Sequence, residues 1–464
     1  MLASFLSRLS GKAFCTVGIA LFFTSTDIAA QDREVSVTVY PNGLGLIRDM
    51  RTLEIAKGRS NLTFSRIARQ INPTSVRVRS LTTPEQVSVL EQRFQHDPIT
   101  SETLLARHAG QPVELWVEDS DTPVKGRLLE TDGDVTLQED GGRIHIIRRD
   151  TIRRFTVPGL PPGMGQEPTL FWMVDNTGNG GIHRLETGYL TSGMNWHAEY
   201  TAVINQTDNA MLFSGWASID NRSGMTYDNA AITLVAGDVH QVSKAQPMAM
   251  MRTTMADMAM EGAAQFQEQR LFEYHSYTLD RRGTISDNGV VQLSLFPDTR
   301  TQATSQYVYD GGMQPDGVQT RLRLENKKTT GLGRAIPRGT VRIYQEDKQG
   351  RRQFVGEDRI KDLAVNETAY LTVGRAFDII GERTQTDSRV LTKRSREESW
   401  EIVLRNHNKE AVAVRVVEHL QGPGWSIPRS SQKYEKLDAQ TIEFTAQVPA
   451  DGETTVTYSV TYRW

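Results

Sequence analysis

The sequence predicts an all-β protein with a small N-terminal β unit, a small barrel, and then one or two packed antiparallel β-sandwich modules. Two observations support this fold class. Apolar and polar residues alternate with a period of two in many short segments, which is typical of strands with one face in a core. Short turns rich in Asn, Asp and Gly separate these segments, as expected for antiparallel sheets.

The clearest pattern lies between residues 185 and 239. A strand is predicted over residues 196–205, where the side chains of one face alternate with those of the other. One face carries Trp196, Ala198, Tyr200, Ala202 and Ile204, and the other carries His197, Glu199, Thr201, Val203 and Asn205. Met211 to Ile219 predicts a second strand and Ile232 to Ala236 a third. Because short polar turns join the three, we expect an antiparallel meander.

This stretch also resembles a known family. YLTSGMNWHAEY at 189–200 and GWASIDNRSGMTYDNAAITLVAGDV at 215–239 are similar to a bacterial envelope family defined by a domain of unknown function, which also forms the C-terminal part of mucoidy-inhibitor-like proteins. Later matches are EYHSYTLDR at 273–281, QFVGEDRI at 353–360, VGRAFDIIGER at 373–383 and VPADGETTVTYSVTYRW at 448–464. The resemblance covers roughly residues 165–464. It implies a secreted all-β domain and offers no known catalytic residue to carry over.

The amino terminus predicts a signal peptide over residues 1–30. Arg8 and Lys12 precede an apolar run from Ala13 to Phe23, and Ile28–Ala30 offers a small-residue cleavage site. A retained anchor is the rival interpretation, but this run is short for a membrane span, so no transmembrane helix is expected after cleavage. The only cysteine, Cys15, lies within the signal. The expected location is periplasmic or envelope-associated.

Residues 31–100 predict the N-terminal β unit, and residues 101–158 predict a short helix followed by five short strands. That layout resembles an Sm-like or SH3-like small barrel. Arg148, Arg149, Arg153 and Arg154 form a basic cluster there. Some Sm-like barrels bind RNA, but an exported chain with a net charge of −3 meets little nucleic acid. We therefore expect a structural or protein-contact role for this unit and no nucleic-acid partner.

Residues 159–168 are rich in Pro and Gly and predict a linker to a sandwich domain at 169–464. We expect that domain to divide near 311–316 and to contain a hairpin made of Trp400–Arg405 and Val412–Glu418. The alternation of Val456, Tyr458, Val460 and Tyr462 predicts a last sandwich strand with a buried Trp464. An outer-membrane barrel strand is the alternative for this tail.

A methionine-rich insertion interrupts the sandwich domain at residues 246–268. It contains Met248, Met250, Met251, Met255, Met258 and Met260. The preferred interpretation is a mobile insertion outside the fold. Two alternatives remain open: docking on a partner, because methionine is an adaptable apolar side chain, and Cu(I) binding, because thioether sulfur is a soft ligand.

No motif for a hydrolase, metalloprotease or phosphate loop is present in the sequence, so no catalytic residue, metal or cofactor is predicted. Ser430 and Lys433 fit Ser-x-x-Lys without its companion motifs. His197 and Glu199 share a strand face, but two ligands without a third more often form an exposed polar face. We therefore expect an exported, non-catalytic envelope protein that acts through binding surfaces in scaffolding, assembly or adhesion, linked to surface polysaccharide. The alternative is a carbohydrate-active hydrolase whose carboxylates converge between the sandwich modules.

Overall fold

The computed structural model describes residues 33–118, 120–161, 164–165, 167–205, 210–237, 266–271, 274–315, 317–422 and 424–464. These residues form thirty strands, one α-helix and three short 3₁₀-helices. The predicted all-β class is therefore confirmed. The predicted signal peptide and all six methionines of the insertion lie outside the described residues.

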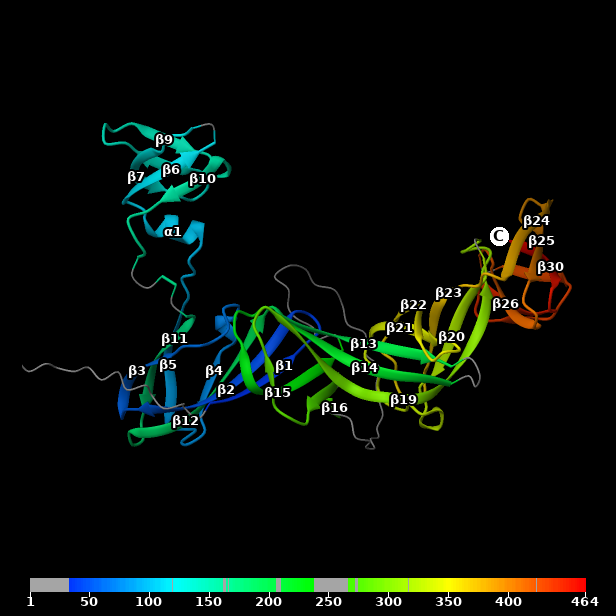
Figure 1. Cartoon of the computed structure of the whole chain (residues 1–464), viewed down its shortest axis with the longest axis horizontal. Helices are drawn as coiled ribbons and strands as arrows, with labels where there is room; N and C mark the ends of the chain where they lie inside the picture. Colours follow the sequence, from blue (N-terminus) through cyan, green and yellow to red (C-terminus); the bar gives the residue numbers. More distant parts are fainter. Residues whose placement is uncertain are drawn as a thin grey trace, which may run out of the picture.

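Two sheets occupy the N-terminal end of the elongated body (Figure 1). One has the order β16-β17-β15-β1-β2-β12-β4, with β18 paired to β15, and the other has the order β3-β11-β5. Their strands are β1 Glu34–Val39, β2 Leu44–Ile55, β3 Gly58–Phe64, β4 Arg77–Ser80, β5 Val87–Gln95, β11 Thr169–Asn176, β12 Gly181–Ser192, β15 Tyr227–Ala236, β16 Phe266–Leu271, β17 Tyr274–Leu279 and β18 Gly283–Ile285. The 3₁₀-helix Pro73–Ser75 precedes β4.

A ten-stranded sheet continues the body toward the C-terminal end. Its main order is β22-β21-β13-β14-β19-β26-β29-β28, while β20 pairs with both β19 and β23. The bounds are β13 Met194–Ile204, β14 Ala210–Asn221, β19 Gly289–Tyr309, β20 Gln319–Glu325, β21 Gly339–Glu346, β22 Arg352–Ile360, β23 Thr368–Arg375, β26 Val412–His419, β28 Tyr434–Lys436 and β29 Thr441–Val448. The 3₁₀-helix Lys328–Thr330 follows β20.

One hydrophobic core joins the first part of the chain to the sandwich strands. β1 pairs in parallel with β15, and β2 pairs with β12 along its whole length. The buried side chains of this first core extend in sequence from Val35 to Leu371. The N-terminal β unit thus shares hydrogen-bonded sheets with strands that come after residue 169.

The predicted three-stranded meander is correct for its first two strands and wrong for the third. β13 and β14 form the expected antiparallel hairpin, but β14 then pairs with β19 while β15 crosses to another sheet. Asn221 lies at this crossing and is fully buried. Its amide nitrogen donates to the carbonyl oxygens of Met225, Ile285 and Ser286, and its Oδ1 accepts from the Ser223 N–H. We call this arrangement an asparagine corner.

The C-terminal module packs a four-stranded sheet, β24-β25-β30-β27, against β26 and β29. The bounds are β24 Ile379–Thr392, β25 Ser395–Asn406, β27 Trp425–Ser430 and β30 Gly452–Arg463. The predicted hairpin of Trp400–Arg405 with Val412–Glu418 is wrong, because β25 pairs with β24 and β30 whereas β26 pairs with β19 and β29. A second asparagine corner at Asn406 carries the chain from one sheet to the other.

Two further expectations for this end of the chain are wrong. The predicted division of the sandwich domain near 311–316 is wrong, because β20 and β23, which follow it, still belong to the ten-stranded sheet. Apart from Tyr309 and Val318, the buried residues of the second core begin only at Ile379. Trp464 does not enter that core: it is 69% exposed, whereas Tyr458 and Tyr462 of β30 are buried. The Trp464 N–H donates to Arg394 O at 3.1 Å, so the backbone of this residue is tied to the turn between β24 and β25.

A five-stranded sheet stands apart from the body on two connecting segments (Figure 1). Its order is β10-β6-β7-β8-β9, and α1 Ser101–Arg107 precedes it. The strands are β6 Pro112–Val117, β7 Val124–Glu130, β8 Val135–Gln138, β9 Ile144–Ile147 and β10 Ile152–Thr156, with the 3₁₀-helix Arg149–Thr151 between β9 and β10. This sheet and Leu105 form a separate third core. The likeness to Sm-like or SH3-like barrels stays a prediction.

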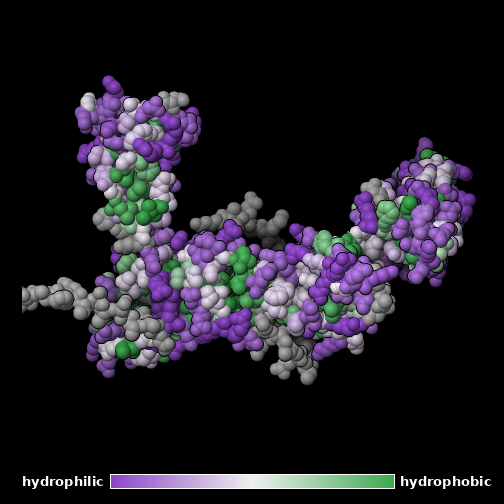
Figure 2. Space-filling model, in the orientation of Figure 1, coloured by the Kyte–Doolittle hydropathy of each residue, from purple (hydrophilic) through white to green (hydrophobic). Residues whose placement is uncertain are grey.

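The surface in view is mainly hydrophilic, with hydrophobic side chains gathered below the five-stranded sheet (Figure 2). Ile99 and Leu160, on the two connecting segments, are each more than half exposed. In the described part of the chain, no helix is long and apolar enough to cross a membrane.

Candidate functional site

The outer face of the ten-stranded sheet carries aromatic and polar side chains side by side, most of them at least partly exposed, whereas Ser214 and Ser218 are buried. We define this outer face by twelve residues that alternate with core positions on five adjacent strands: His197, Glu199, Thr201, Ser214, Trp216, Ser218, Gln292, Ser294, Arg342, Tyr344, Phe354 and Glu357. The pleat places them here because their neighbours, such as Ala198, Ala217 and Leu293, are buried in the first core.

Trp216 is the most prominent aromatic side chain at the centre of the outer face. It lies opposite Glu199 of β13 and Ser294 of β19 in the strand ladders. Its side chain is 42% exposed, although the strand on which it lies is otherwise almost entirely buried. An aromatic ring fixed on a central strand and open to solvent can stack on a flat ligand with little loss of conformational freedom.

A second aromatic group lies farther along the same face. The rings of Tyr344 and Phe354 meet edge to face at 5.7 Å, and Phe354 is 57% exposed. Tyr344 pairs with Val203 of β13. Val203 lies four residues beyond Glu199, which is the β13 partner of Trp216. Strand spacing and rise place this pair roughly 16 Å from Trp216. The face therefore offers two aromatic contacts to an extended ligand.

Glu199 connects the polar side chains around Trp216. Its Oε2 accepts from Arg342 Nη1 at 3.3 Å and from Gln292 Nε2 at 3.1 Å, and Oε1 lies 3.4 Å from His197 Nε2. Partial burial acts to raise the pKa of Glu199, but hydrogen bonds and charge from Arg342 and His197 outweigh it and lower that pKa below its usual value. Glu199 is therefore ionised at neutral pH, and the stabilisation that its hydrogen bonds provide is lost only in acid, as the pH falls through the lowered pKa.

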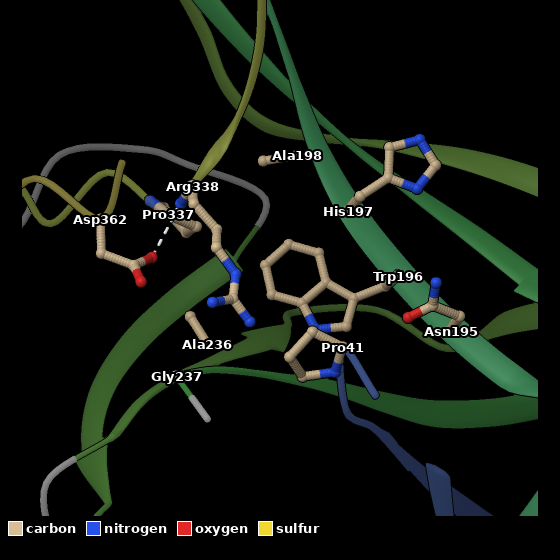
Figure 3. Close-up of a pocket in the computed structure, with 10 residues that line it drawn as sticks. All are labelled: Pro41, Asn195, Trp196, His197, Ala198, Ala236, Gly237, Pro337, Arg338 and Asp362. Atoms are coloured by element: carbon tan, nitrogen blue, oxygen red, sulfur yellow. Dashed lines mark hydrogen bonds between the residues drawn. The ribbon is translucent and has the colours of Figure 1, made fainter. Parts of the chain in front are cut away.

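A pocket of about 150 Å³ lies where the turn after β1, the start of β13 and the segment before β21 meet (Figure 3). Trp196 donates from Nε1 to Val235 O at 3.0 Å, and the Arg338 N–H donates to Asp362 Oδ1 at 2.8 Å. The imidazole of His197 points away from this group (Figure 3). The volume is below the range of about 300–1,000 Å³ usual for small-molecule sites.

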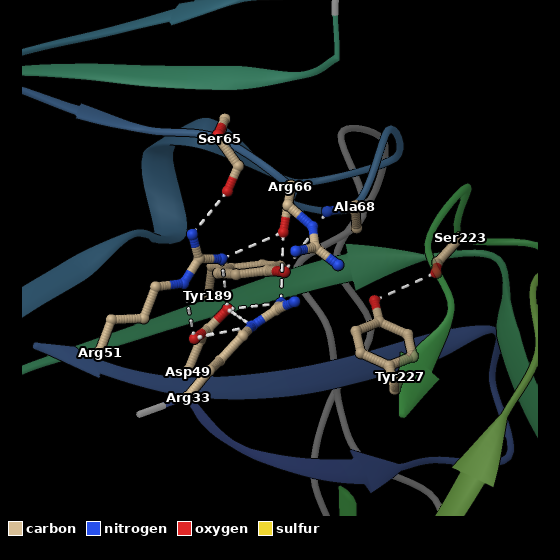
Figure 4. Close-up of polar contacts among 9 residues, drawn as sticks. All are labelled: Arg33, Asp49, Arg51, Ser65, Arg66, Ala68, Tyr189, Ser223 and Tyr227. Atoms are coloured by element: carbon tan, nitrogen blue, oxygen red, sulfur yellow. Dashed lines mark hydrogen bonds and ion pairs between the residues drawn. The ribbon is translucent and has the colours of Figure 1, made fainter. Parts of the chain in front are cut away.

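A buried charge cluster lies in the first core (Figure 4). Asp49 has no exposed side-chain surface and binds Arg33 at 2.8 Å and Arg51 at 2.7 Å. Arg51 also donates to the carbonyl oxygens of Ser65 and Arg66 and covers the ring of Phe64. Because these partners enclose the carboxylate, this cluster serves the fold and offers no opening to a ligand.

The candidate residues drawn from the sequence do not assemble into a catalytic centre. Ser430 donates its hydroxyl proton to Gln432 O at 2.6 Å, which engages it within its own turn. His197 and Glu199 do lie together, as expected, but Glu199 is bound by Arg342 and Gln292. Within the described ranges, no group of three or more His, Cys, Asp or Glu is placed to hold a metal ion.

The four arginines of the predicted basic cluster, Arg148, Arg149, Arg153 and Arg154, all have partners within the five-stranded unit. Arg148 pairs with Asp150, Arg149 donates to Gly133 O and Thr131 O, Arg153 donates to Val117 O and Ser120 O, and Arg154 covers the ring of Trp116. The cluster is thus engaged in holding the turns and edge of the sheet.

Sequence reasoning missed Trp216. β14 contains almost no charge, so its two faces look alike and the exposed residue does not stand out. The serines at positions 214 and 218 are the available signal, because period-2 alternation puts them on the same face as Trp216.

One family model matches the C-terminal part of the chain. The family model described as "Domain of unknown function (DUF4139)" matches residues 185–464. No curated protein matches the chain.

Proposed function

Since the chain belongs to the DUF4139 family, whose description names no activity, we propose from the geometry that it is a non-catalytic envelope protein that binds surface polysaccharide through the outer face. The observation that carries this proposal is the solvent-open Trp216 set within the Glu199 network. A likeness to mucoidy-inhibitor-like proteins, proposed from the sequence, points in the same direction.

The chemistry of the outer face suits a saccharide. A sugar ring presents C–H groups on its faces, which pack on the electron-rich face of an aromatic ring, and hydroxyls on its rim. Gln292, Arg342 and Glu199 supply donors and acceptors beside Trp216. The ion pair between Glu199 and Arg342 leaves little net charge there, which favours a largely neutral chain of sugars.

The alternative, a carbohydrate-active hydrolase, needs two carboxyl groups facing each other across the scissile bond. The ten residues that line the pocket include one carboxylate, Asp362, which is engaged with the Arg338 N–H. On the outer face, Glu199 is held by Arg342, and its lowered pKa makes it a poor proton donor at neutral pH. Neither place favours hydrolysis.

Replacing Trp216 is the direct test of this function. We expect Trp216→Ala to weaken binding to purified envelope polysaccharide by about tenfold or more, since central aromatic side chains carry much of the energy of such contacts. Calorimetric titration measures the affinity, and the chain length of the polysaccharide should stay unchanged during incubation. Phe377→Ala, a 95% exposed aromatic outside the outer face, is the matched control. Equal affinity of Trp216→Ala and the unmodified protein would reject the proposal.

We also propose that the protein is exported to the periplasm or cell envelope. The support is the charged start, the apolar run from Ala13 to Phe23 and the small residues at 28–30. Amino-terminal sequencing of the fractionated protein should find Gln31 first. An intact Met1 would contradict this proposal.

A further inference from the structure

The distal end of the C-terminal module combines exposed apolar side chains with unpaired positive charge. The turn between β24 and β25 contains Lys393 and Arg394, and Trp464 is tied to it by the bond from its N–H to Arg394 O. Leu391 and Val390, just before the turn, are 50% and 77% exposed. We call these five residues, together with Arg463, the C-terminal tip.

Packing within the fold does not account for the apolar side chains of the C-terminal tip. Trp464 is 69% exposed and does not belong to the second core, which ends at Tyr462. Soluble surfaces carry scattered apolar residues. Here Val390 and Leu391 lie beside the turn and Trp464 is bonded to it, so three large ones at one end of the module form a group that can enter an apolar phase. Tryptophan in particular favours the boundary between water and lipid.

The side-chain charges of the C-terminal tip are of one sign. Among the described residues, Lys393, Arg394 and Arg463 have no ion-pair partner. The acidic groups nearby are already neutralised: Asp387 by Arg389, Glu398 by Arg396 and Glu397 by Arg429. The side chains of the tip therefore present three free cations, which outnumber the carboxylate of Trp464 and favour an anionic surface.

We propose that the C-terminal tip docks on the surface of an anionic lipid membrane. Trp464, Leu391 and Val390 enter the interface between headgroups and acyl chains, while Lys393, Arg394 and Arg463 contact anionic headgroups. An anionic polymer would account for the cations but would give the exposed apolar side chains no partner, so a membrane fits both observations. This inference is independent of the polysaccharide site on the outer face.

Vesicle co-sedimentation tests the docking. The protein should bind vesicles of phosphatidylcholine with one part in about three of phosphatidylglycerol, bind pure phosphatidylcholine far less, and lose binding as salt is added. We expect Leu391→Ser/Trp464→Ser and, separately, Lys393→Glu/Arg394→Glu each to weaken binding at least about tenfold. All four positions are exposed, so circular dichroism and melting should stay unchanged.

The control uses the opposite end of the same module. Phe377→Ser/Lys409→Glu changes an exposed aromatic and an exposed cation beside the Asn406 corner, and it should bind as the unmodified protein does. Unchanged binding of the tip variants, or equal binding to neutral vesicles, overturns the proposal. Dextran sulfate serves as a lipid-free anion. If Leu391→Ser/Trp464→Ser keeps full vesicle binding while Lys393→Glu/Arg394→Glu loses binding to vesicles and to dextran sulfate, the site binds anionic polymers. The membrane proposal then fails.

Discussion

Asp49→Asn is expected to lower the free energy of unfolding by about 3–5 kcal/mol, because it leaves buried arginine charge without its partner. Asp49 is fully buried and receives Arg33 and Arg51 together (Figure 4), and the Arg51 side chain is only 7% exposed. Since both cations stay in place in the variant, their desolvation is no longer compensated. Urea unfolding followed by tryptophan fluorescence measures the change.

The control for this prediction is a surface carboxylate of β1. Glu34 pairs with Arg184 and Arg282, but all three side chains are 39% exposed or more. Glu34→Gln should cost less than about 1 kcal/mol, because water replaces most of what an exposed ion pair provides. If Asp49→Asn lowers the free energy of unfolding as little as Glu34→Gln does, the two arginines must move or become hydrated in the variant. That result would contradict the prediction that their buried charge is left uncompensated.

The second large effect is expected at the asparagine corner of the C-terminal module. Asn406 is 1% exposed, and its amide nitrogen donates to Glu410 O at 2.8 Å, Pro449 O at 3.0 Å and Val448 O at 3.4 Å. Asn406→Ala removes these donors and should cost about 3 kcal/mol, since each unsatisfied buried group costs about 1–3 kcal/mol. The decrease should appear as an earlier urea transition.

Asn406→Asp separates the roles of the two side-chain ends. It keeps an acceptor for the Asn408 N–H but offers no donor to the three carbonyls, so it should destabilise at least as much as Asn406→Ala. Lys409→Ala, an exposed change in the same turn, should stay within about 0.5 kcal/mol. A mild effect of Asn406→Asp would mean that the donated hydrogen bonds contribute little to the corner.

Local alternation predicted the strands well, as at β13, where Trp196, Ala198, Tyr200 and Ala202 are buried and His197 is exposed. Which strands pair was harder to predict. A turn containing Asn looks the same in sequence whether the chain folds back beside its own strand or crosses to the opposite sheet. At Asn221 and Asn406 it crosses, and the deciding hydrogen bonds reach residues 64 and 42 positions away in the chain.

The same limit applies to the outer face. His197 and Glu199 could be placed on one strand face, but Arg342 and Gln292 come from strands about 143 and 93 residues farther along. The parallel pairing of β13 with β21, which brings Arg342 near, has no local signal. Trp464 shows the opposite error: alternation continues through the last residue, while the core that should receive it ends at Tyr462.

Hydroxyl-radical footprinting with bound polysaccharide tests the central claim most directly, because it reports the solvent access of individual side chains. We expect the oxidation of Trp216 and Phe354, which are 42% and 57% exposed in the free protein, to fall when envelope polysaccharide is added. Phe377 and Trp464 should oxidise as before. The binding of polysaccharide by the outer face would be contradicted if the protein binds the polysaccharide while Trp216 and Phe354 oxidise as before. Protection would then appear elsewhere, around Arg338 or on the five-stranded sheet.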